Sequence, residues 1–421
     1  MLKVWSEDMA AGYLDRSDRG PGSVFAYEMA ADEARAVSLS MPKRLASYEQ
    51  AFGLHPIFEM NLPEGALRER LRLAFAKATG HFDDLDLLAV TGRSQLGRLR
   101  YTARDGNLDE DVPFQSVDEI LARRRDGSLF SYLLERFAAH SGVSGVQPKI
   151  LIRDEADSAI LEESRGRFST SFRGATHIVK FWNPADYPQL AANEFFCLRA
   201  AERCGLDVPR FRLAEDGTAL VLDRFDLRAD GTYRGMEDFC VLNGLSTSRK
   251  YHGGYEKTVF RRLKDYMVGD IEAWRRDAGR LFTLFVLNCA VRNGDAHLKN
   301  FAVVYDDVRA TPRLSPVYDI VTTTVYLPED RMALTLNAKP LWPEARHLDQ
   351  LGTTRCALAP AEAAAVRERV ADAMSESLAE MAVHAAEHPE FTEIADRMAT
   401  VWQEGIRTSL GVAARHVSPA R

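Results

Sequence analysis

An almost wholly apolar segment, residues 281–291, runs directly into a string of polar residues. Its strongly apolar character predicts a buried helix over residues 277–291. The polar string Arg292-Asn-Gly-Asp-Ala-His-Leu-Lys-Asn300 begins where this helix is expected to end. Because a buried helix holds the residues that follow it at a defined place, this string is the first candidate for a functional loop.

The composition places the chain among folded proteins with more than one domain. It has 421 residues, of which 46% are hydrophobic and 27% charged, a length that allows two or three packed domains. A disordered or fibrous chain is therefore excluded. The formal net charge of −7 argues against a protein whose main task is to coat nucleic acid, and leaves room only for a local basic patch.

No segment is predicted to cross a membrane. The apolar run 281–291 is about half as long as a membrane helix and contains Asn288. The N-terminus lacks the basic start and apolar core of a signal peptide, so we expect no export by that route. The cysteines form no CxxC pair, which indicates reduced core residues in a cytoplasmic protein. They are Cys197, Cys204, Cys240, Cys289 and Cys356.

The predicted fold class is α+β, with a mixed α/β N-terminal part and an all-helical C-terminal lobe. Three parts are expected: a small subdomain over 1–105, a nucleotide-binding part over 106–235 and a catalytic part over 236–421. Strands and helices are assigned from local alternation and helical spacing. The expected strands are 2–5, 11–15, 23–27, 149–153, 177–181 and 219–224, and the expected helices include 63–79, 187–204 and those within 358–410.

Asp295 and Asn300 have the Asp-x-x-x-x-Asn spacing of the protein-kinase catalytic loop. In that loop the Asp receives the proton of the substrate hydroxyl and the Asn holds a metal ion. Asp319 follows where a kinase places its second magnesium ligand. The His-Arg before the first Asp and the Phe-Gly after the second are absent, and Asp and Asn are also common in helix caps and turns.

Upstream residues supply the other parts of a kinase site. Lys180 ends a strand-like run, and Glu194 lies on the next predicted helix. A kinase has a lysine that binds the phosphates in the first position and the glutamate that pairs with this lysine in the second. Gly142-Val-Ser-Gly145 offers backbone amides for phosphates, with Lys149 near in sequence, although a short glycine turn would read the same. Phe225, after an apolar strand, stands where a kinase hinge packs on adenine. Each match is weak alone, but their order favours a kinase.

One competing motif points to zinc. His384-Ala-Ala-Glu-His388 matches the H-x-x-E-H pattern of one class of zinc peptidase. Such a site needs a third ligand, usually from a separate downstream helix, and Pro389 ends this helix at once. An Ala-rich surface helix is the better interpretation.

Taken together, the motifs resemble the HipA family of toxin serine/threonine kinases, over most of the chain. The first 105 residues are similar to the family's small N-terminal subdomain, including Ser38-Leu-Ser-Met-Pro42 and Asn61-Leu-Pro-Glu64. The other matching motifs are Ser144-Gly-Val-Gln-Pro-Lys149, Thr176-His-Ile-Val-Lys180, Asn193-Glu194, Asp223-Arg-Phe-Asp226, Glu237-Asp-Phe-Cys240, Lys250-Tyr-His-Gly-Gly254, Asp295-Ala-His-Leu-Lys-Asn-Phe301 and Pro316-Val-Tyr-Asp319.

The resemblance implies a HipA-like two-lobed kinase fold that uses ATP and Mg²⁺. It implies that Asp295 accepts the proton, that Asn300 and Asp319 bind Mg²⁺, and that Glu194 forms a structural ion pair with Lys180. The implied nucleotide contacts are Ser144, Gly145, Val146, Gln147, Pro148 and Lys149 in a phosphate loop, Lys180, then Asp223, Arg224 and Phe225 at the adenine, and His297, Leu298, Lys299, Asn300, Tyr318 and Asp319.

The resemblance also implies a biological role. Family members are toxins of two-gene modules. A small helix-turn-helix antitoxin (HipB-like) neutralises the toxin and makes most of the contacts to operator DNA. Their known substrates are aminoacyl-tRNA synthetases, whose phosphorylation on a serine stalls translation and causes growth arrest and persistence. Some members phosphorylate a serine three residues before the glycine matched by Gly145, but this chain has Gly142 there. We therefore predict autophosphorylation at Ser144, with Ser141 as the alternative.

Two other classes of function stay open at this point. A kinase-like fold can serve as a binding or regulatory protein, although the retained Lys180, Asp295, Asn300 and Asp319 speak against it. A kinase of a lipid or another small molecule is the third interpretation, because the usual protein-kinase motifs are incomplete.

Overall fold

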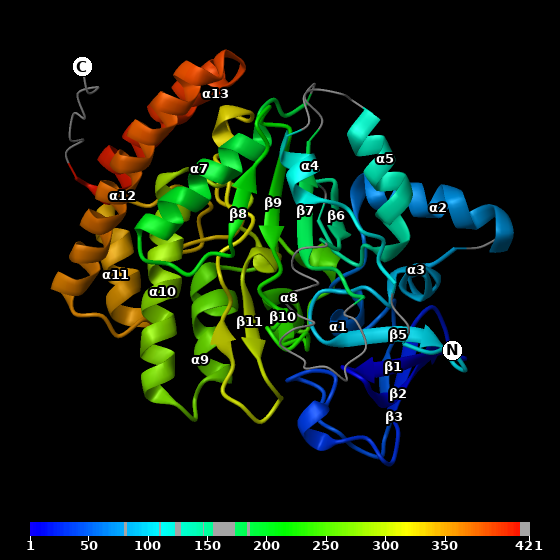
Figure 1. Ribbon diagram of the computed structural model, residues 1–421. Helices are drawn as coiled ribbons and strands as arrows, with labels where there is room; N and C mark the ends of the chain where they lie inside the picture. The colour runs from blue at the N-terminus through cyan, green and yellow to red at the C-terminus, as the bar shows by residue number, and fades with distance from the viewer. Residues whose placement is uncertain are drawn as a thin grey trace. The chain divides into compact units, whose positions relative to one another are not determined.

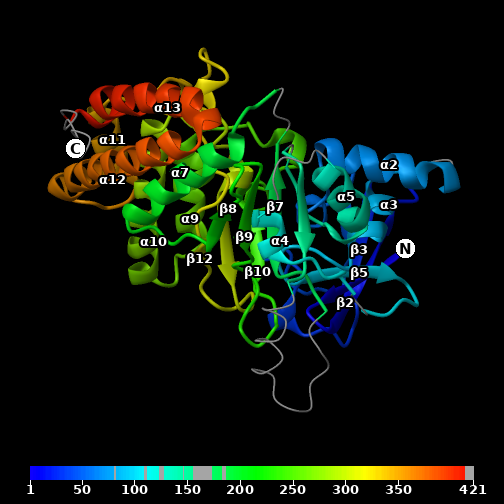
Figure 2. The same cartoon turned by 45° about the horizontal axis from the view of Figure 1, so that its top comes forward.

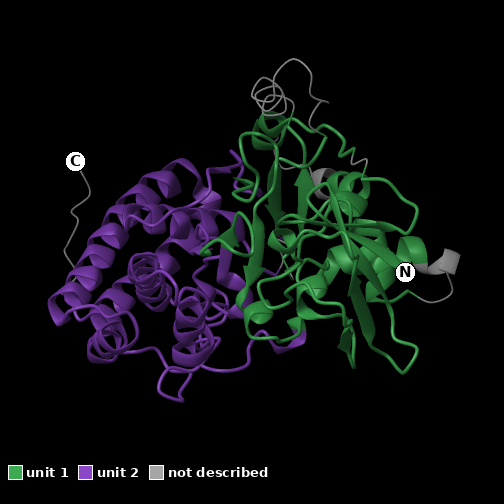
Figure 3. Ribbon diagram, turned by 90° about the horizontal axis from the view of Figure 1, so that it is seen from below, with its two compact units in different colours: residues 1–181, 221–247, 304–312 green, residues 182–220, 248–303, 313–421 purple. Residues whose placement is uncertain are grey.

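The computed structural model divides the chain into two compact units. It describes residues 1–79, 82–108, 111–122, 128–145, 147–154, 173–182 and 186–412. Unit 1 comprises residues 1–181, 221–247 and 304–312, and unit 2 comprises residues 182–220, 248–303 and 313–421 (Figure 3). The three-part division predicted from the sequence, with boundaries near residues 105 and 235, stays a prediction.

Unit 1 begins with an antiparallel sheet in the order β4-β3-β2-β1-β5. The strands predicted at 2–5, 11–15 and 23–27 are confirmed within it. Gly12 is required where β2 meets β3, because a Cβ there would lie 2.2 Å from the carbonyl oxygen of Ala26. The strands are β1 (Leu2–Ser6), β2 (Met9–Arg16), β3 (Ser23–Tyr27), β4 (Tyr48–Gln50) and β5 (Leu99–Ala103).

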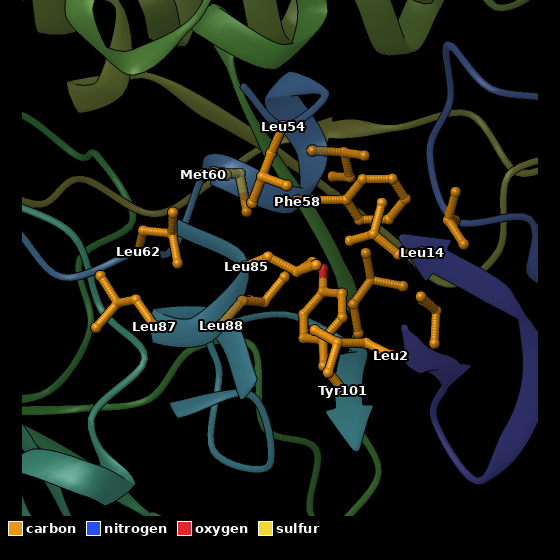
Figure 4. Packing of buried hydrophobic residues seen from close by; sticks show 14 of the residues in the cluster. Leu2, Leu14, Leu54, Phe58, Met60, Leu62, Leu85, Leu87, Leu88 and Tyr101 are labelled. Atoms are coloured by element: carbon orange, nitrogen blue, oxygen red, sulfur yellow. The ribbon is translucent and has the colours of Figure 1, made fainter. Parts of the chain in front are cut away.

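The core of this region joins the sheet to three helices, α1 (Pro56–Glu59), α2 (Gly65–Thr79) and α3 (Asp84–Thr91). Figure 4 shows Leu85 and Phe58 from the helices approaching Tyr101 from β5. The ring centroids of Phe58 and Tyr101 lie 6.1 Å apart. The helix predicted over 63–79 is confirmed as α2, whose leucines at helical spacing are buried in this core.

The rest of unit 1 is built around two further strand groups. β6 (Lys149–Ile152) pairs antiparallel with β7 (His177–Phe181), and β9 (Ala219–Asp223) lies on the other side of β7. These three strands confirm the predictions at 149–153, 177–181 and 219–224. β10 (Gly235–Asp238) lies beside β11 (Ala302–Tyr305), so residues distant in the sequence meet in this unit. The helices are α4 (Val117–Ala122), α5 (Ser128–Phe137) and α8 (Phe239–Leu242).

Unit 2 is a helical bundle around α12 (Pro360–Glu387). Figures 1 and 2 both show α12 beside α13 (Thr392–Gly405), and α12 also packs on α7 (Leu190–Arg203), α10 (Ile271–Ala290) and α11 (Ala345–Arg355). These helices confirm the predictions over 187–204, 277–291 and 358–410. The remaining elements are α9 (Arg262–Tyr266), the π-helical segments η4 (Tyr255–Arg261) and η8 (Ile406–Leu410), and short strands β8 (Phe211–Leu213) and β12 (Arg313–Leu314).

The predicted α+β class is confirmed, with one refinement in the C-terminal part. Short strands β11 and β12 interrupt the helices of that part. In the described part of the chain, no helix combines the length and apolar character needed to cross a membrane. All five cysteines are buried and form no disulfide, as expected for core residues.

Candidate functional site

The polar string predicted to follow the buried helix begins where α10 ends. Asp270 caps the start of α10, accepting a hydrogen bond from the backbone N–H of Ala273 at 2.9 Å. At the other end Arg292 adopts a left-handed backbone, with φ 58°, which turns the chain away from the helix. Asn293 then donates its side-chain amide to Asn288 at 2.6 Å and accepts the backbone N–H of Asp295 at 3.1 Å. The main chain of the loop is therefore tied to the helix that delivers it.

Asp295 presents its carboxylate at the surface of this loop. Half of the side chain is exposed (51%), while Tyr251 Oη donates a hydrogen bond to Oδ1 at 2.6 Å. His297 Nε2 lies 4.0 Å from the same oxygen. Burial by the surrounding protein raises the pKa of Asp295, the Tyr251 hydrogen bond opposes this rise, and the negative charge of Asp319 adds to it. A raised pKa and solvent access suit a general base.

Asn300 and Asp319 are brought together from segments 19 residues apart. The side-chain amide of Asn300 donates to the backbone carbonyl of Asp319 at 3.0 Å. Asn300 Oδ1 is buried and has no hydrogen-bond partner among the described residues, an orphaned oxygen of the kind a hard cation takes as ligand. Asp319 has a left-handed backbone, with φ 52°, a strained conformation that persists where the surroundings impose it.

The segment after Asp319 is anchored by α7 and α13. Asn193, on α7, accepts the backbone N–H of Thr322 at 2.8 Å and donates to its carbonyl at 3.0 Å. Trp402, on α13, donates to the Thr322 hydroxyl at 2.7 Å. This buried, doubly bonded asparagine fixes the backbone three residues beyond Asp319, so α7 positions the Asp319 segment.

The residues between Asp295 and Asn300 face inward. His297 is 7% exposed, and burial, followed by the positive charge of Lys250, lowers the pKa of its imidazole to about 3. Leu298 is fully buried and donates its backbone N–H to the carbonyl of Lys250 at 3.1 Å. Lys299 is buried too, and its carbonyl accepts the hydroxyl of Tyr318 at 2.9 Å. The predicted residues His297 to Asn300, Tyr318 and Asp319 thus form one cluster in unit 2.

Unit 1 holds a pair of buried lysines. Lys149 on β6 and Lys180 on β7 are directly opposite in the antiparallel register and are 5% and 4% exposed. The register thus brings two buried, positively charged residues onto neighbouring strands. Gly145, with φ 121°, leaves the space that Lys149 Nζ uses, since a Cβ there would lie 2.4 Å from it. The glycine therefore lets the ammonium approach the loop backbone.

The predicted phosphate loop is attached to β7. Gln147 donates its side-chain amide to the carbonyl of Phe181 at 3.1 Å, and the carbonyl of Pro148 accepts the backbone N–H of Phe181 at 3.0 Å. Val146 lies outside the described residues. Ser144 is half-buried, whereas Ser141 is fully buried and its hydroxyl bonds the Phe137 carbonyl at 2.7 Å and the Leu151 N–H at 2.9 Å.

The predicted adenine residues divide between two roles. Asp223 Oδ1 lies 3.2 Å from Nε2 of the buried His177. Arg224 is 4% exposed, and its guanidinium bonds Asp226 and the carbonyl of Gln95 at 2.8 Å. That side chain therefore works inside the fold of unit 1. Phe225 is half-buried, so a free ring face for adenine stays a prediction.

Two further sequence features are the predicted Lys180–Glu194 ion pair and the competing zinc motif of residues 384–388. Glu194 is fully buried on α7 in unit 2, while Lys180 belongs to unit 1, so their ion pair stays a prediction. His384 and His388 stack with ring centroids 4.1 Å apart at the end of α12. Across the described ranges, no group of three or more His, Cys, Asp or Glu side chains is placed to hold a metal.

Sequence reasoning missed the residues that support the loop. Tyr251, Arg292 and Asn193 act through partners 44, 117 and 129 residues away. Asn193 stands next to Glu194 in one of the matching motifs, but nothing in its spacing marks it as an anchor. Tyr251 follows a lysine in another such motif and has no local signal of its own.

A mixed α/β fold with this carboxylate and amide loop, and a lysine pair at a glycine loop, defines a kinase-like protein. Two family models match the chain: the HipA N-terminal domain over residues 2–102 and the HipA-like C-terminal domain over residues 141–378. The chain belongs to the HipA family.

Curated relatives and a solved structure agree with this assignment. Two relatives are from Sinorhizobium fredii (strain NBRC 101917 / NGR234). "Putative kinase Y4dM" is 30% identical over 301 residues, which span 67% of this chain and 66% of that protein, slightly under two thirds of its length. "Putative kinase Y4mE" is 29% identical over 346 residues, spanning 77% of this chain and 78% of that protein.

The solved structure is the complex of the Shewanella oneidensis MR-1 toxin–antitoxin system HipA, HipB and its operator DNA. It matches with a TM-score of 0.68 and 19% identity over 98% of both chains. At this identity the likeness shows the fold, and it confirms the expected HipA-like fold class.

Proposed function

We propose that this chain is an ATP-dependent serine/threonine protein kinase and the toxin of a toxin–antitoxin pair. It would transfer the γ-phosphoryl of ATP to a serine of a protein, with an aminoacyl-tRNA synthetase as the substrate class, and so cause growth arrest. The observation that supports this most is the meeting of Asn300 with Asp319 in the unit whose loop presents Asp295.

Asp295 is proposed as the general base. Its half-exposed carboxylate can accept the proton of a serine hydroxyl as the hydroxyl oxygen attacks the γ-phosphorus and ADP leaves. The loop's task is positioning, which the backbone hydrogen bond of Asp295 to Asn293 and the hydrogen bond from Tyr251 provide.

Asn300 and Asp319 fit a magnesium ion. The donor set consists of a carboxylate and the orphaned Oδ1 of Asn300, oxygen ligands of the type that Mg²⁺ prefers. When bound, Mg²⁺ offsets the negative charge of the ATP phosphates. Lys149 and Lys180 are proposed to hold phosphate oxygens, together with backbone N–H groups of the predicted phosphate loop.

The partners are proposed from the family and from charge. The Shewanella relative was solved with HipB and operator DNA, and we propose a HipB-like helix-turn-helix antitoxin for this chain. A net charge of −7 suits a toxin that meets DNA mainly through a basic partner in the cytoplasm.

Ser144 is proposed as the site of autophosphorylation. The alternative Ser141 is buried and its hydroxyl is engaged on both sides, so a kinase could reach it only after unfolding of the loop. A phosphopeptide map of protein incubated with ATP should find phosphate on Ser144. A map without phosphate between residues 141 and 149 would remove this part of the proposal.

The function is tested with wild type, Asp295→Ala and the control Asp396→Ala, which removes an exposed carboxylate on α13. Each is expressed in a bacterial host while growth is followed, and lysates are incubated with labelled ATP and Mg²⁺. Wild type and the control should arrest growth and label a protein, whereas Asp295→Ala should do neither. If all three are harmless and label nothing, the kinase proposal fails. Labelling of small molecules alone would favour a small-molecule kinase.

A further inference from the structure

Tyr251 is the aromatic residue whose hydroxyl meets the proposed base. We propose that Tyr251 is a positioning residue that holds the Asp295 carboxylate in the orientation needed for proton transfer. This inference rests on the phosphoryl transfer proposed above. Tyr251 lies in one of the matching motifs, but neither the sequence patterns nor the similarity to other proteins gives it a role.

The first observation is the hydrogen bond itself. Tyr251 Oη donates to Asp295 Oδ1 at 2.6 Å, although the Tyr251 side chain is 51% exposed. A carboxylate has two oxygens, and a donor fixed on Oδ1 sets the direction in which Oδ2 points. The oxygen left for the substrate hydroxyl is therefore placed by Tyr251.

The second observation is that Tyr251 is itself fixed by the loop it serves. Its ring packs edge-on against His297, with centroids 5.0 Å apart and an interplanar angle of 76°. The preceding residue, Lys250, accepts the backbone N–H of Leu298 at 3.1 Å. Contacts on the ring and on the neighbouring peptide thus hold Tyr251 against residues 297 and 298. An exposed tyrosine held in this way keeps one rotamer, as positioning requires.

The third observation is that little else in the loop can move Asp295. Its backbone N–H is bonded to Asn293 Oδ1 at 3.1 Å, and its carbonyl accepts the N–H of His297 at 2.7 Å. With the main chain fixed on both sides, rotation about the side-chain bonds is the freedom that remains. The Tyr251 hydrogen bond restrains that rotation. Removing the hydroxyl alone should therefore impair the chemical step without moving the loop.

The test compares Tyr251→Phe with the matched control Tyr187→Phe. Tyr187 lies in the same unit, is 43% exposed and packs edge-on against Tyr326 at 5.5 Å and 85°. Phosphoryl transfer to protein substrate is measured at saturating and limiting ATP, alongside the midpoint of thermal unfolding. For Tyr251→Phe we expect kcat to fall at least about tenfold, with KM for ATP within about twofold of wild type and an unchanged unfolding midpoint. The control should match wild type.

A second comparison separates positioning from a general structural effect. If Tyr251 acts through Asp295, the double variant Tyr251→Phe, Asp295→Ala should be no less active than Asp295→Ala alone, because the group being positioned is gone. Mass spectrometry of ATP-treated wild type should find no phosphate on Tyr251. Phosphotyrosine there would overturn the proposal, because the hydroxyl would then be an acceptor.

The outcomes distinguish this inference from the function on which it rests. If wild type transfers phosphate, Asp295→Ala does not, and Tyr251→Phe keeps the wild-type kcat, the role of Tyr251 is refuted and the kinase stands. A rise in KM for ATP that accounts for the whole loss in Tyr251→Phe would also refute it. If wild type itself transfers nothing, both proposals fail together.

Discussion

At the scale of single residues, Asn300 shows why an amide is used at the proposed metal site. Its two ends do different work: the N–H₂ group bonds the Asp319 carbonyl at 3.0 Å, and the buried Oδ1 is left for a ligand. An aspartate could supply the oxygen but not the donor, and would face the carbonyl of Asp319 with a like partial charge. The amide therefore couples the geometry of the two proposed magnesium ligands.

Asn300→Ala should raise the Mg²⁺ concentration needed for half-maximal phosphoryl transfer by at least about tenfold, because one oxygen ligand and the tie to Asp319 are both lost. Asn300→Asp should keep more metal affinity than Asn300→Ala. Binding of Mn²⁺ in the presence of ATP, followed by electron paramagnetic resonance, gives the same comparison without catalysis. Equal Mn²⁺ affinity in wild type and Asn300→Ala would contradict the assignment.

Glu237 makes the stability of unit 1 depend on pH. It is fully buried and accepts hydrogen bonds from the Leu39 N–H at 2.7 Å, the Ser38 hydroxyl at 2.9 Å and the Tyr305 hydroxyl at 2.6 Å. Burial raises its pKa from 4.5 to about 7, and the hydrogen bonds oppose this rise. Between these values the unfolded chain releases the proton that the folded chain keeps. The free energy of unfolding therefore falls as pH rises through this window, by about 3 kcal/mol in all.

Glu237→Gln should remove this pH dependence, since glutamine keeps one acceptor oxygen and the Ser38 hydroxyl can turn to accept from the amide. Urea unfolding of both proteins at pH 5 and pH 8 checks it. Relative to wild type, the variant should gain about 3 kcal/mol between the two pH values. Subtracting the two proteins removes the contribution of buried histidines such as His55, whose pKa is lowered to about 4 by burial. A constant difference would contradict the prediction.

At the scale of elements, the proposed catalytic loop depends on the far end of the chain. The guanidinium of Arg292 donates to the Ser409 hydroxyl at 2.7 Å and the Thr408 hydroxyl at 2.6 Å, both on η8. Gly405, just before η8, lies so close to α10 that a Cβ would be 1.9 Å from the carbonyl oxygen of Ala290. The C-terminal π-helical turn η8 thus holds Arg292, the residue at which the chain leaves α10 and enters the loop.

Arg292→Ala should lower the free energy of unfolding by about 2 to 4 kcal/mol, because buried donors and acceptors lose their partners. Alanine keeps the left-handed backbone strain, so the change reports the side chain. The control Arg407→Ala removes an arginine on η8 whose side chain is 67% exposed, and should change stability by less than about 0.5 kcal/mol. Thermal and urea unfolding measure both. Equal effects of the two substitutions would refute the stabilising role of the contacts between Arg292 and η8.

The helices and strands also show which parts of the fold could be predicted from the sequence. Periodicity and turn residues are local, so they predicted α10, α12 and the strands that hold Lys149 and Lys180. The order of motifs led us to expect Asn300 and Asp319 at one site, and their contact is present, while the roles of the site residues stay predictions. What could not be predicted are stabilising contacts between residues distant in the sequence, such as the hydrogen bond of Arg292 to a residue 117 positions later. Such contacts leave no pattern in either partner's neighbourhood.

At the scale of the whole molecule, the chain passes repeatedly between the two units. Unit 1 takes residues 221–247 and 304–312 from the C-terminal half, and unit 2 takes residues 182–220 from the N-terminal half. Glu237 and Tyr305 complete one unit, while Asn193 anchors the other. A cut at residue 235, where the sequence suggests a lobe boundary, would remove parts from both. The region before residue 105 differs, since its buried cluster is formed within residues 2–101 apart from Ala138 and Val241.

These facts predict how fragments behave. Residues 1–105 expressed alone should unfold cooperatively on heating, because the five strands and α1 to α3 bury their own core. Residues 1–235 should retain that transition but leave the remainder unfolded, since β10 and β11 are missing. Residues 236–421 should be unfolded, since α7 and its contact to Thr322 are missing. Circular dichroism and limited proteolysis of each fragment check this, with co-expressed 1–235 and 236–421 as the control that should recover protection. A stable, cooperatively unfolding 236–421 fragment would show that α7 is dispensable for the fold around Asp295.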